Sequence, residues 1–197
     1  MPPPERKLEL LELTIQRLTA AGYVYIGMDH FALPDDELSW ARENGTLQRN
    51  FQGYSTHADC DLIGLGVSSI GKVSDSFSQS VKELSAYYAR IDQGLLPVHR
   101  GYRLNADDKL RGEVISALMC RGRVDFPALE ARHGIRFREY FDESLARLED
   151  HVADGLVQIQ DDALVLLPQG QLMLRSVAMA FDAYLGEGKS ERFSRTI

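Results

Sequence analysis

The 197-residue chain has little cysteine, no excess of positive charge and no long apolar run. Its two cysteines, Cys60 and Cys120, lie far apart and form no C-x-x-C pair, which excludes a disulfide framework and an all-cysteine metal site. The formal net charge of -7 disfavours nucleic acid as a partner, because phosphate binding needs a basic surface. No apolar stretch approaches the ~18–20 residues that span a bilayer. The first residues lack the basic-then-apolar order of a signal peptide, so we expect a cytoplasmic protein with neither nucleic acid nor membrane as partner.

The first 50 residues carry alternating helix and strand patterns. Apolar residues at helical spacing predict a helix over residues 4–21, which Gly22 ends. A β-rich run follows at residues 23–28, and we expect residues 29–34 to form a loop at the C-terminal end of that strand. A short helix over residues 35–44 and an extended segment over 47–51 come next. Helix, tight turn and strand in this order are typical of a βα-repeat fold entered partway through.

Residues 50–71 have the composition least typical of a purely structural segment, and we predict the ligand site there. A polar segment leads into an apolar run over residues 62–67 that Gly64 and Gly66 interrupt. Glycine in a strand pattern marks a bulge or a place where a ligand comes close. The run itself predicts a buried, parallel-type strand. A polar loop beside such a strand is where open α/β sheets and barrels hold ligands.

The second half of the chain has a mainly helical pattern. A helix is predicted over residues 79–93 and a linker over 94–101. The pattern then predicts helices over residues 105–121, 125–133 and 137–152, a hairpin of 156–159 with 164–167, and a last helix over 168–185. Leu110, Val114, Leu118 and Met119 form the expected apolar face of the first of these helices, and Phe141, Leu145, Leu148 and Val152 that of the third. Three helices, a hairpin and a helix form a winged-helix arrangement, whose third helix is too acidic for a DNA groove.

Several residues of the first half have side chains that could bind a metal or act in catalysis, but their spacing matches no known motif. Asp29, His30, His57, Asp59, Cys60 and Asp61 are metal-ligand types, but no two have a metal-binding spacing. Cys60 with His57 as base is a weaker alternative, since three residues in a loop do not position the pair. We therefore assign no metal ligand and no catalytic residue. Phe51 and Ile70 could sandwich a flat heterocycle while the Gln52 amide bonds its edge, and plain core packing is the alternative for both apolar side chains.

Two long runs, IGMDHFALPDDELSWARENGTLQRNFQGYSTH and DLIGLGVSSIG, and the terminal RFSRTI resemble the oxygen-independent coproporphyrinogen III oxidases. These enzymes are the coproporphyrinogen dehydrogenases of the radical S-adenosylmethionine family. The resemblance covers essentially the whole chain and implies the C-terminal portion of such an enzyme. The implied fold is α/β or α+β: the last part of an incomplete β/α barrel, followed by a mainly helical, winged-helix-like domain.

The resemblance also implies cofactors and a substrate. The family uses S-adenosylmethionine and a [4Fe–4S] cluster on a C-x-x-x-C-x-x-C motif, and neither Cys60 nor Cys120 stands in such a motif. By the resemblance, Ile70 matches a position that contacts S-adenosylmethionine, and Phe51 and Gln52 match contacts near the same pocket. Asp29 and His30 match a family motif to which we assign no role. The substrate would be coproporphyrinogen III, whose oxidative decarboxylation to protoporphyrinogen IX belongs to heme biosynthesis.

The resemblance implies four segments: residues 1–78 of the radical S-adenosylmethionine barrel, a helix and linker over 79–101, a winged-helix-like domain over 102–186 and a polar tail over 187–197. Without cluster cysteines the chain alone is expected to be inactive. The alternative is a module that binds a tetrapyrrole or a protein without catalysis. Barrel strands missing beside residues 1–75 would leave exposed apolar surface, through which the chain could dimerise.

Overall fold

The computed structural model describes residues 3–57 and 60–185, so the predicted tail over 187–197 lies outside it. The fold is α+β, with helices and small sheets whose described strands pair antiparallel. The chain forms two compact units: the first comprises Met1–Thr56 with Arg111–Ile197, and the second comprises His57–Leu110. Within the described residues no helix is both long and apolar enough to cross a membrane.

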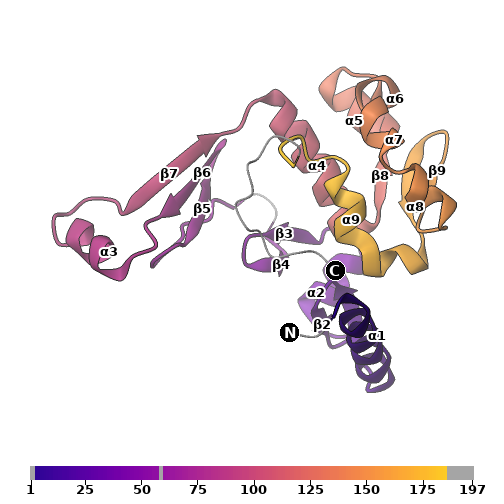
Figure 1. Cartoon of the computed structure of the whole chain (residues 1–197), viewed down its shortest axis with the longest axis horizontal. Helices are drawn as coiled ribbons and strands as arrows, with labels where there is room; N and C mark the ends of the chain where they lie inside the picture. Colours follow the sequence, from indigo (N-terminus) through magenta and orange to yellow (C-terminus); the bar gives the residue numbers. More distant parts are fainter. Residues whose placement is uncertain (1–2, 58–59, 186–197) are drawn as a thin grey trace. The chain divides into compact units, whose positions relative to one another are not determined.

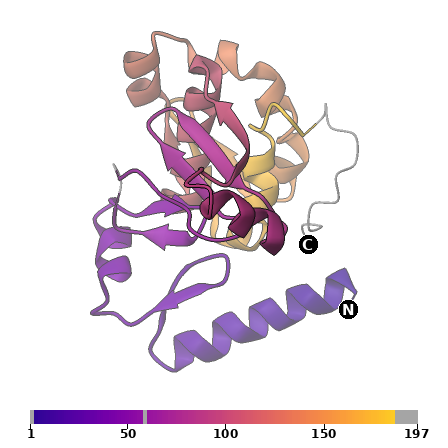
Figure 2. The ribbon, with the colours of Figure 1, turned by 90° about the vertical axis from the view of Figure 1, so that its left-hand side faces the viewer.

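The N-terminal part of the first unit is a long helix followed by two hairpins (Figures 1 and 2). Its elements are α1 (Pro4–Ala20), β1 (Val24–Gly27), β2 (His30–Ala32), α2 (Glu37–Glu43), β3 (Gln48–Asn50) and β4 (Gly53–Ser55). The predicted helices and first strand are confirmed. The loop expected over residues 29–34 is wrong in part, because His30–Ala32 pairs back on β1. Met28, at a positive φ of 54°, makes the reversal that allows this pairing.

The rest of the first unit combines short helices with a three-stranded sheet of order β8-β10-β9. Its elements are α4 (Ala106–Arg121, which begins in the second unit), β8 (Arg123–Asp125), α5 (Phe126–His133), α6 (Phe137–Tyr140), α7 (Asp142–Ala146), α8 (Glu149–Ala153), β9 (Val157–Ile159), β10 (Ala163–Leu166), the 3-10 helix η1 (Pro168–Met173) and α9 (Leu174–Met179). The predicted hairpin is confirmed as β9 and β10.

Two predictions for this region are corrected. The single helix expected over residues 137–152 is three short helices, and Val152 is 40% exposed rather than inward. The breaks between the three helices change the direction of the chain. The helical spacing of apolar residues therefore does not place Val152 on the buried face. The last helix begins as 3-10 turns and ends at Met179, well before residue 185.

The core of the first unit is built around stacked phenylalanines. The Phe126 and Phe137 rings stack with centroids 4.1 Å apart, and Phe141 and Phe181 complete the group. The predicted apolar face of α4 is buried here, with Val114 and Leu118 fully enclosed. Asp125 caps α5 by accepting a hydrogen bond from the Ala128 N–H. This burial of aromatic and aliphatic surface is the main stabilising term of the unit.

The second unit is a three-stranded antiparallel sheet with one short helix (Figure 1). Its elements are β5 (Ile70–Val73), β6 (Ser76–Ser80), α3 (Leu84–Ile91) and β7 (Val98–Arg103). The helix expected over residues 79–93 is therefore shorter, since β6 extends to Ser80. The segment 94–101, expected as a linker, contains the first four residues of β7.

The buried parallel strand predicted over residues 62–67 is wrong. Only Leu62 pairs, through one antiparallel bridge to Lys72, while Ile63 is 74% exposed and Leu65 is 85% exposed. Gly64 passes so close to β5 that an added Cβ would lie 2.8 Å from the Ile70 carbonyl oxygen. Gly64 thus allows two backbone segments to approach closely, as glycine in a strand pattern indicates. The neighbouring apolar side chains, however, are exposed.

Candidate functional site

Phe51 and Gln52 form the two-residue turn of the β3–β4 hairpin in the first unit. The Asn50 side chain fixes this turn, because its Oδ1 accepts a hydrogen bond from the Gln52 N–H at 2.8 Å. Phe51 is 56% exposed, so the turn presents an aromatic ring and an amide together at the surface. The alternative prediction, that Phe51 packs in the core, is wrong because more than half of the residue is exposed.

The base of this hairpin is locked to the β1–β2 hairpin by ring contacts. The His30 ring meets the Tyr54 ring edge-on, with centroids 5.1 Å apart and planes at 85°. Gly53 and Gly27 let the two hairpins approach, since a Cβ on Gly53 would clash with the His30 ring and one on Gly27 with the Tyr54 hydroxyl. His30 is therefore a packing residue of the turn that carries Phe51 and Gln52.

Tyr54 is the buried anchor of this arrangement. Its hydroxyl donates a hydrogen bond to the Met119 carbonyl oxygen at 2.9 Å, which ties the hairpin to α4. Burial raises the pKa of Tyr54 to about 12, so the phenol stays protonated at neutral pH. Asp29 Oδ1 lies 2.8 Å from His30 Nδ1, but among the described residues that nitrogen has no hydrogen-bond partner with suitable geometry.

Ile70 lies in the second unit, half-buried at the start of β5 and opposite Gln79 of β6. Gln79 Oε1 accepts a hydrogen bond from Arg100 Nε at 2.9 Å, and Arg100 is the next cross-strand partner. Opposite residues of an antiparallel sheet share one face, so Ile70, Gln79 and Arg100 form an apolar-to-cationic row. The structure thus brings Phe51 and Gln52 together in one unit and places Ile70 in the other.

The other chemical side chains of the first half form no metal cluster in the described part of the chain. Asp61 is engaged with backbone, since its Oδ1 accepts a hydrogen bond from the Ser74 N–H at 2.8 Å. Cys60 is exposed, and Asp59 lies outside the described residues.

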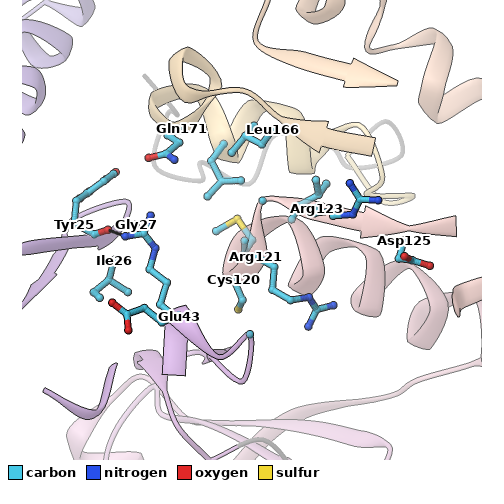
Figure 3. A pocket seen from close by; sticks show the side chains of 16 residues that line it. Tyr25, Ile26, Gly27, Glu43, Cys120, Arg121, Arg123, Asp125, Leu166 and Gln171 are labelled. Carbon is cyan, nitrogen blue, oxygen red and sulfur yellow. Dashed lines mark hydrogen bonds between the residues drawn. The ribbon is translucent and has the colours of Figure 1, made fainter. Parts of the chain in front are cut away.

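A cavity of about 380 Å³ opens in the first unit between β1, the end of α4 and β10 (Figure 3). Arg42 crosses one side, where its Nη1 donates a hydrogen bond to the Tyr25 carbonyl oxygen at 2.5 Å. Cys120 lines the floor, and burial raises the pKa of its thiol, which keeps it protonated and unreactive. In Figure 3 the guanidinium groups of Arg121 and Arg123 extend in different directions and do not converge on one point. No local sequence pattern predicted this cavity, because its walls come from segments that lie far apart in the chain, such as those of Tyr25 and Leu166.

The comparisons with known proteins agree with one another. Residues 104–173 match the family model described as HemN C-terminal domain. Over all of its residues the chain is 48% identical to the oxygen-independent coproporphyrinogen III oxidase of Pseudomonas aeruginosa and 46% identical to that of Salmonella typhimurium. It spans 43% of the length of either relative.

A solved structure of Escherichia coli coproporphyrinogen III oxidase (HemN), described as a radical SAM enzyme, superimposes with a TM-score of 0.88. That match has 43% sequence identity and covers 93% of this chain and 42% of the solved chain. In both sequence and fold, the chain is therefore similar to part of the oxygen-independent coproporphyrinogen III oxidases, and residues 104–173 are similar to the HemN C-terminal domain.

Proposed function

We propose that the chain works as part of an oxygen-independent coproporphyrinogen III oxidase in the cytoplasm. The reaction is the oxidative decarboxylation of two propionate side chains of coproporphyrinogen III, which gives the vinyl groups of protoporphyrinogen IX in heme biosynthesis. The observation that carries the proposal is the fold match, with a TM-score of 0.88 over 93% of the chain at 43% identity. At that identity, the match supports a shared role in addition to a shared fold.

The residues present do not fit the iron–sulfur cluster of this family. Such a cluster takes cysteine thiolates as ligands, and this chain has two cysteines, one in each unit. Cys120 is buried, and its raised pKa opposes the thiolate that a metal requires. We assign the cluster and its radical chemistry to polypeptide beyond these 197 residues, in the same chain or another, and expect this chain alone to be inactive.

We propose that each unit of this chain supplies contacts to S-adenosylmethionine. Phe51 offers an exposed ring face for a flat heterocycle, and Gln52 offers an amide for its polar edge. Ile70 adds a branched apolar side chain on β5. The role of these residues is to bind and orient the ligand and to exclude water from it.

The test is a full-length chimera, in which this chain replaces the matching 43% of the Pseudomonas aeruginosa relative. We expect turnover of coproporphyrinogen III by the chimera. The substitution Phe51→Ala should raise KM for S-adenosylmethionine about tenfold, the effect of losing one aromatic stacking contact. Trp40→Ala is the matched control, since Trp40 is also 56% exposed and should leave KM unchanged.

Two results would overturn the proposal. One is a chimera that folds and holds its cluster but converts no coproporphyrinogen III. The other is this chain alone taking up a stoichiometric cluster from iron and sulfide and turning over substrate.

The predicted dimer is a separate proposal. The described part of residues 1–75 exposes large apolar side chains, including Leu10, Leu13, Leu33 and Trp40. Such surface supports association through this region. Light scattering of the isolated chain tests it, and a monomer at all concentrations contradicts it.

A further inference from the structure

Strands β5, β6 and β7 form the sheet of the second unit (Figure 1), and the neighbours of Arg100 on β7 hold its side chain in place. Arg100 Nε donates a hydrogen bond at 2.9 Å to Oε1 of Gln79, which lies directly opposite on β6. Gln79 Nε2 in turn donates one to the Ser68 carbonyl oxygen at 3.3 Å. Ser68 is fixed as well, because its N–H donates to the Val81 carbonyl oxygen at 2.8 Å. The Gln79 amide therefore positions the guanidinium of Arg100 from one side.

The contact with Gln79 engages only the Nε–H of Arg100. A guanidinium has five N–H donors, and its terminal nitrogens can bind a carboxylate through two parallel hydrogen bonds. Arg100 is exposed, and no carboxylate in residues 3–57 and 60–185 forms a salt bridge with it. The Nη1 and Nη2 atoms are thus free to bind an anionic group from outside this part of the chain.

The sheet face that carries Arg100 is otherwise apolar, aromatic and cationic. Directly opposite residues of an antiparallel sheet share a face, as do residues two apart along a strand. Two adjacent rows therefore lie on this face, and we call their six residues the Ile70 face: Ile70, Gln79 and Arg100 in one row, and Lys72, Phe77 and Tyr102 in the next. Each outer strand contributes one cation to it, Lys72 on β5 and Arg100 on β7.

This composition fits a ligand with an apolar or flat body and a carboxylate. Ile70, Phe77 and Tyr102 offer surface to the body, and Arg100 offers a fork of donors to the carboxylate. The chain as a whole has a net charge of -7, so its surface in general repels anions. Both compounds of the proposed reaction have the required group: S-adenosylmethionine has an amino-acid carboxylate, and coproporphyrinogen III has propionates.

We propose that Arg100, positioned by Gln79, binds a carboxylate of the ligand that lies against Ile70. This proposal rests on the proposed function and deepens it, because it names the side chain that recognises the negative charge of the ligand. Lys72 adds electrostatic attraction without fixed direction, whereas the planar guanidinium of Arg100 also sets the orientation of the carboxylate. The role of Arg100 is to bind and orient the ligand.

Equilibrium binding to the full-length chimera tests this site without a need for turnover. Equilibrium dialysis measures S-adenosylmethionine, and fluorescence titration measures coproporphyrin III, the oxidised form of the substrate. Arg100→Gln should raise Kd for one of these probes about tenfold, as loss of a charge-assisted pair of hydrogen bonds implies. A rise for S-adenosylmethionine identifies its amino-acid carboxylate as the bound group, and a rise for coproporphyrin III identifies a propionate.

Arg103→Gln is the matched control. Arg103 is an exposed arginine on the same strand, but it lies opposite Ser76 and therefore on the other face of the sheet. The control substitution removes the same charge, so both Kd values should stay unchanged if the direction of Arg100 matters.

Gln79→Glu tests the positioning separately. The substitution preserves the size of the side chain but gives the guanidinium a carboxylate partner inside the sheet, which competes with the ligand. The Kd that rises in Arg100→Gln should therefore also rise in Gln79→Glu, although Arg100 is retained.

The possible failures are distinguishable. Unchanged Kd values for both probes in Arg100→Gln, or equal rises in Arg100→Gln and Arg103→Gln, overturn the carboxylate site and leave the proposed function standing. A chimera with Arg100 intact that binds neither probe overturns both proposals. A chimera that binds both probes and holds its cluster but converts no coproporphyrinogen III overturns the proposed function alone.

Discussion

Different interactions stabilise each of the two units of this chain. The C-terminal part of the first unit encloses Phe137, Phe141 and Phe181 almost completely, and its helices pack on them. In the described part of the second unit the buried large apolar side chains are Val81 and, at its end, Leu110. Hydrogen bonds of the β5-β6-β7 ladder and the Asp75–Lys109 ion pair, at 2.7 Å, replace a core there. That ion pair lies at the surface, where solvent screens it, so it adds little to stability.

The contrast shows that a unit can have fully paired strands and still bury little apolar surface. A sheet can be fully paired and still depend on another surface for its stability, because net hydrogen-bond energy is small beside apolar burial. The first unit has the features of a self-sufficient core. The described part of the second unit buries few large apolar side chains and depends mainly on its paired strands.

The largest effect should come from emptying the core of the first unit. Phe137→Ala removes a fully buried ring that touches Phe126, Phe141 and Phe181, and we expect a loss of about 3–5 kcal/mol in urea unfolding. Val152→Ala, at a 40% exposed position, is the control and should cost about 0.5 kcal/mol. Equal losses from the two variants would break the comparison.

A second effect concerns the buried phenol that joins the β3–β4 hairpin to α4. The pKa of Tyr54 in the folded state is about 12, above its ordinary value, so stability is full below about pH 10 and falls as the unfolded phenol ionises. Between about pH 10 and 12 the loss should reach about 3 kcal/mol, at 1.36 kcal/mol for each pH unit.

Tyr54→Phe checks this. The variant should lose about 1–3 kcal/mol at neutral pH, because the buried Met119 carbonyl oxygen is left without its donor, but should show a shallower alkaline decline. Thermal unfolding at a series of pH values measures both. Curves that stay parallel from neutral to alkaline pH would contradict the assignment to Tyr54.

The smallest effect should come from the second unit of the chain alone. Leu84→Ala removes a side chain that is 60% exposed, so we expect less than about 0.5 kcal/mol in the same urea assay. A loss above about 1.5 kcal/mol would show that Leu84 is buried in the isolated chain, and would remove the distinction between the two units.

Local patterns predicted the elements whose neighbours are close in sequence. The apolar face of α4, the short helix predicted over residues 125–133 and the β9–β10 hairpin each depend on a few adjacent residues. Predictions failed where distant packing decides the outcome. Ile63 and Leu65 read as a buried strand, yet Gly64 lies against β5 and turns both outward.

The sequence by itself determined which family the chain resembles, the helices α1 and α4 and the lack of a cysteine cluster motif, because each of these depends on residue identity and short spacing. Tertiary structure alone decided the role of His30 and the burial of Tyr54. Both are set by surfaces that meet across sequence separations, such as Tyr54 with Met119. Periodicity in a chain reports which face of an element is apolar, and only packing decides whether something covers that face.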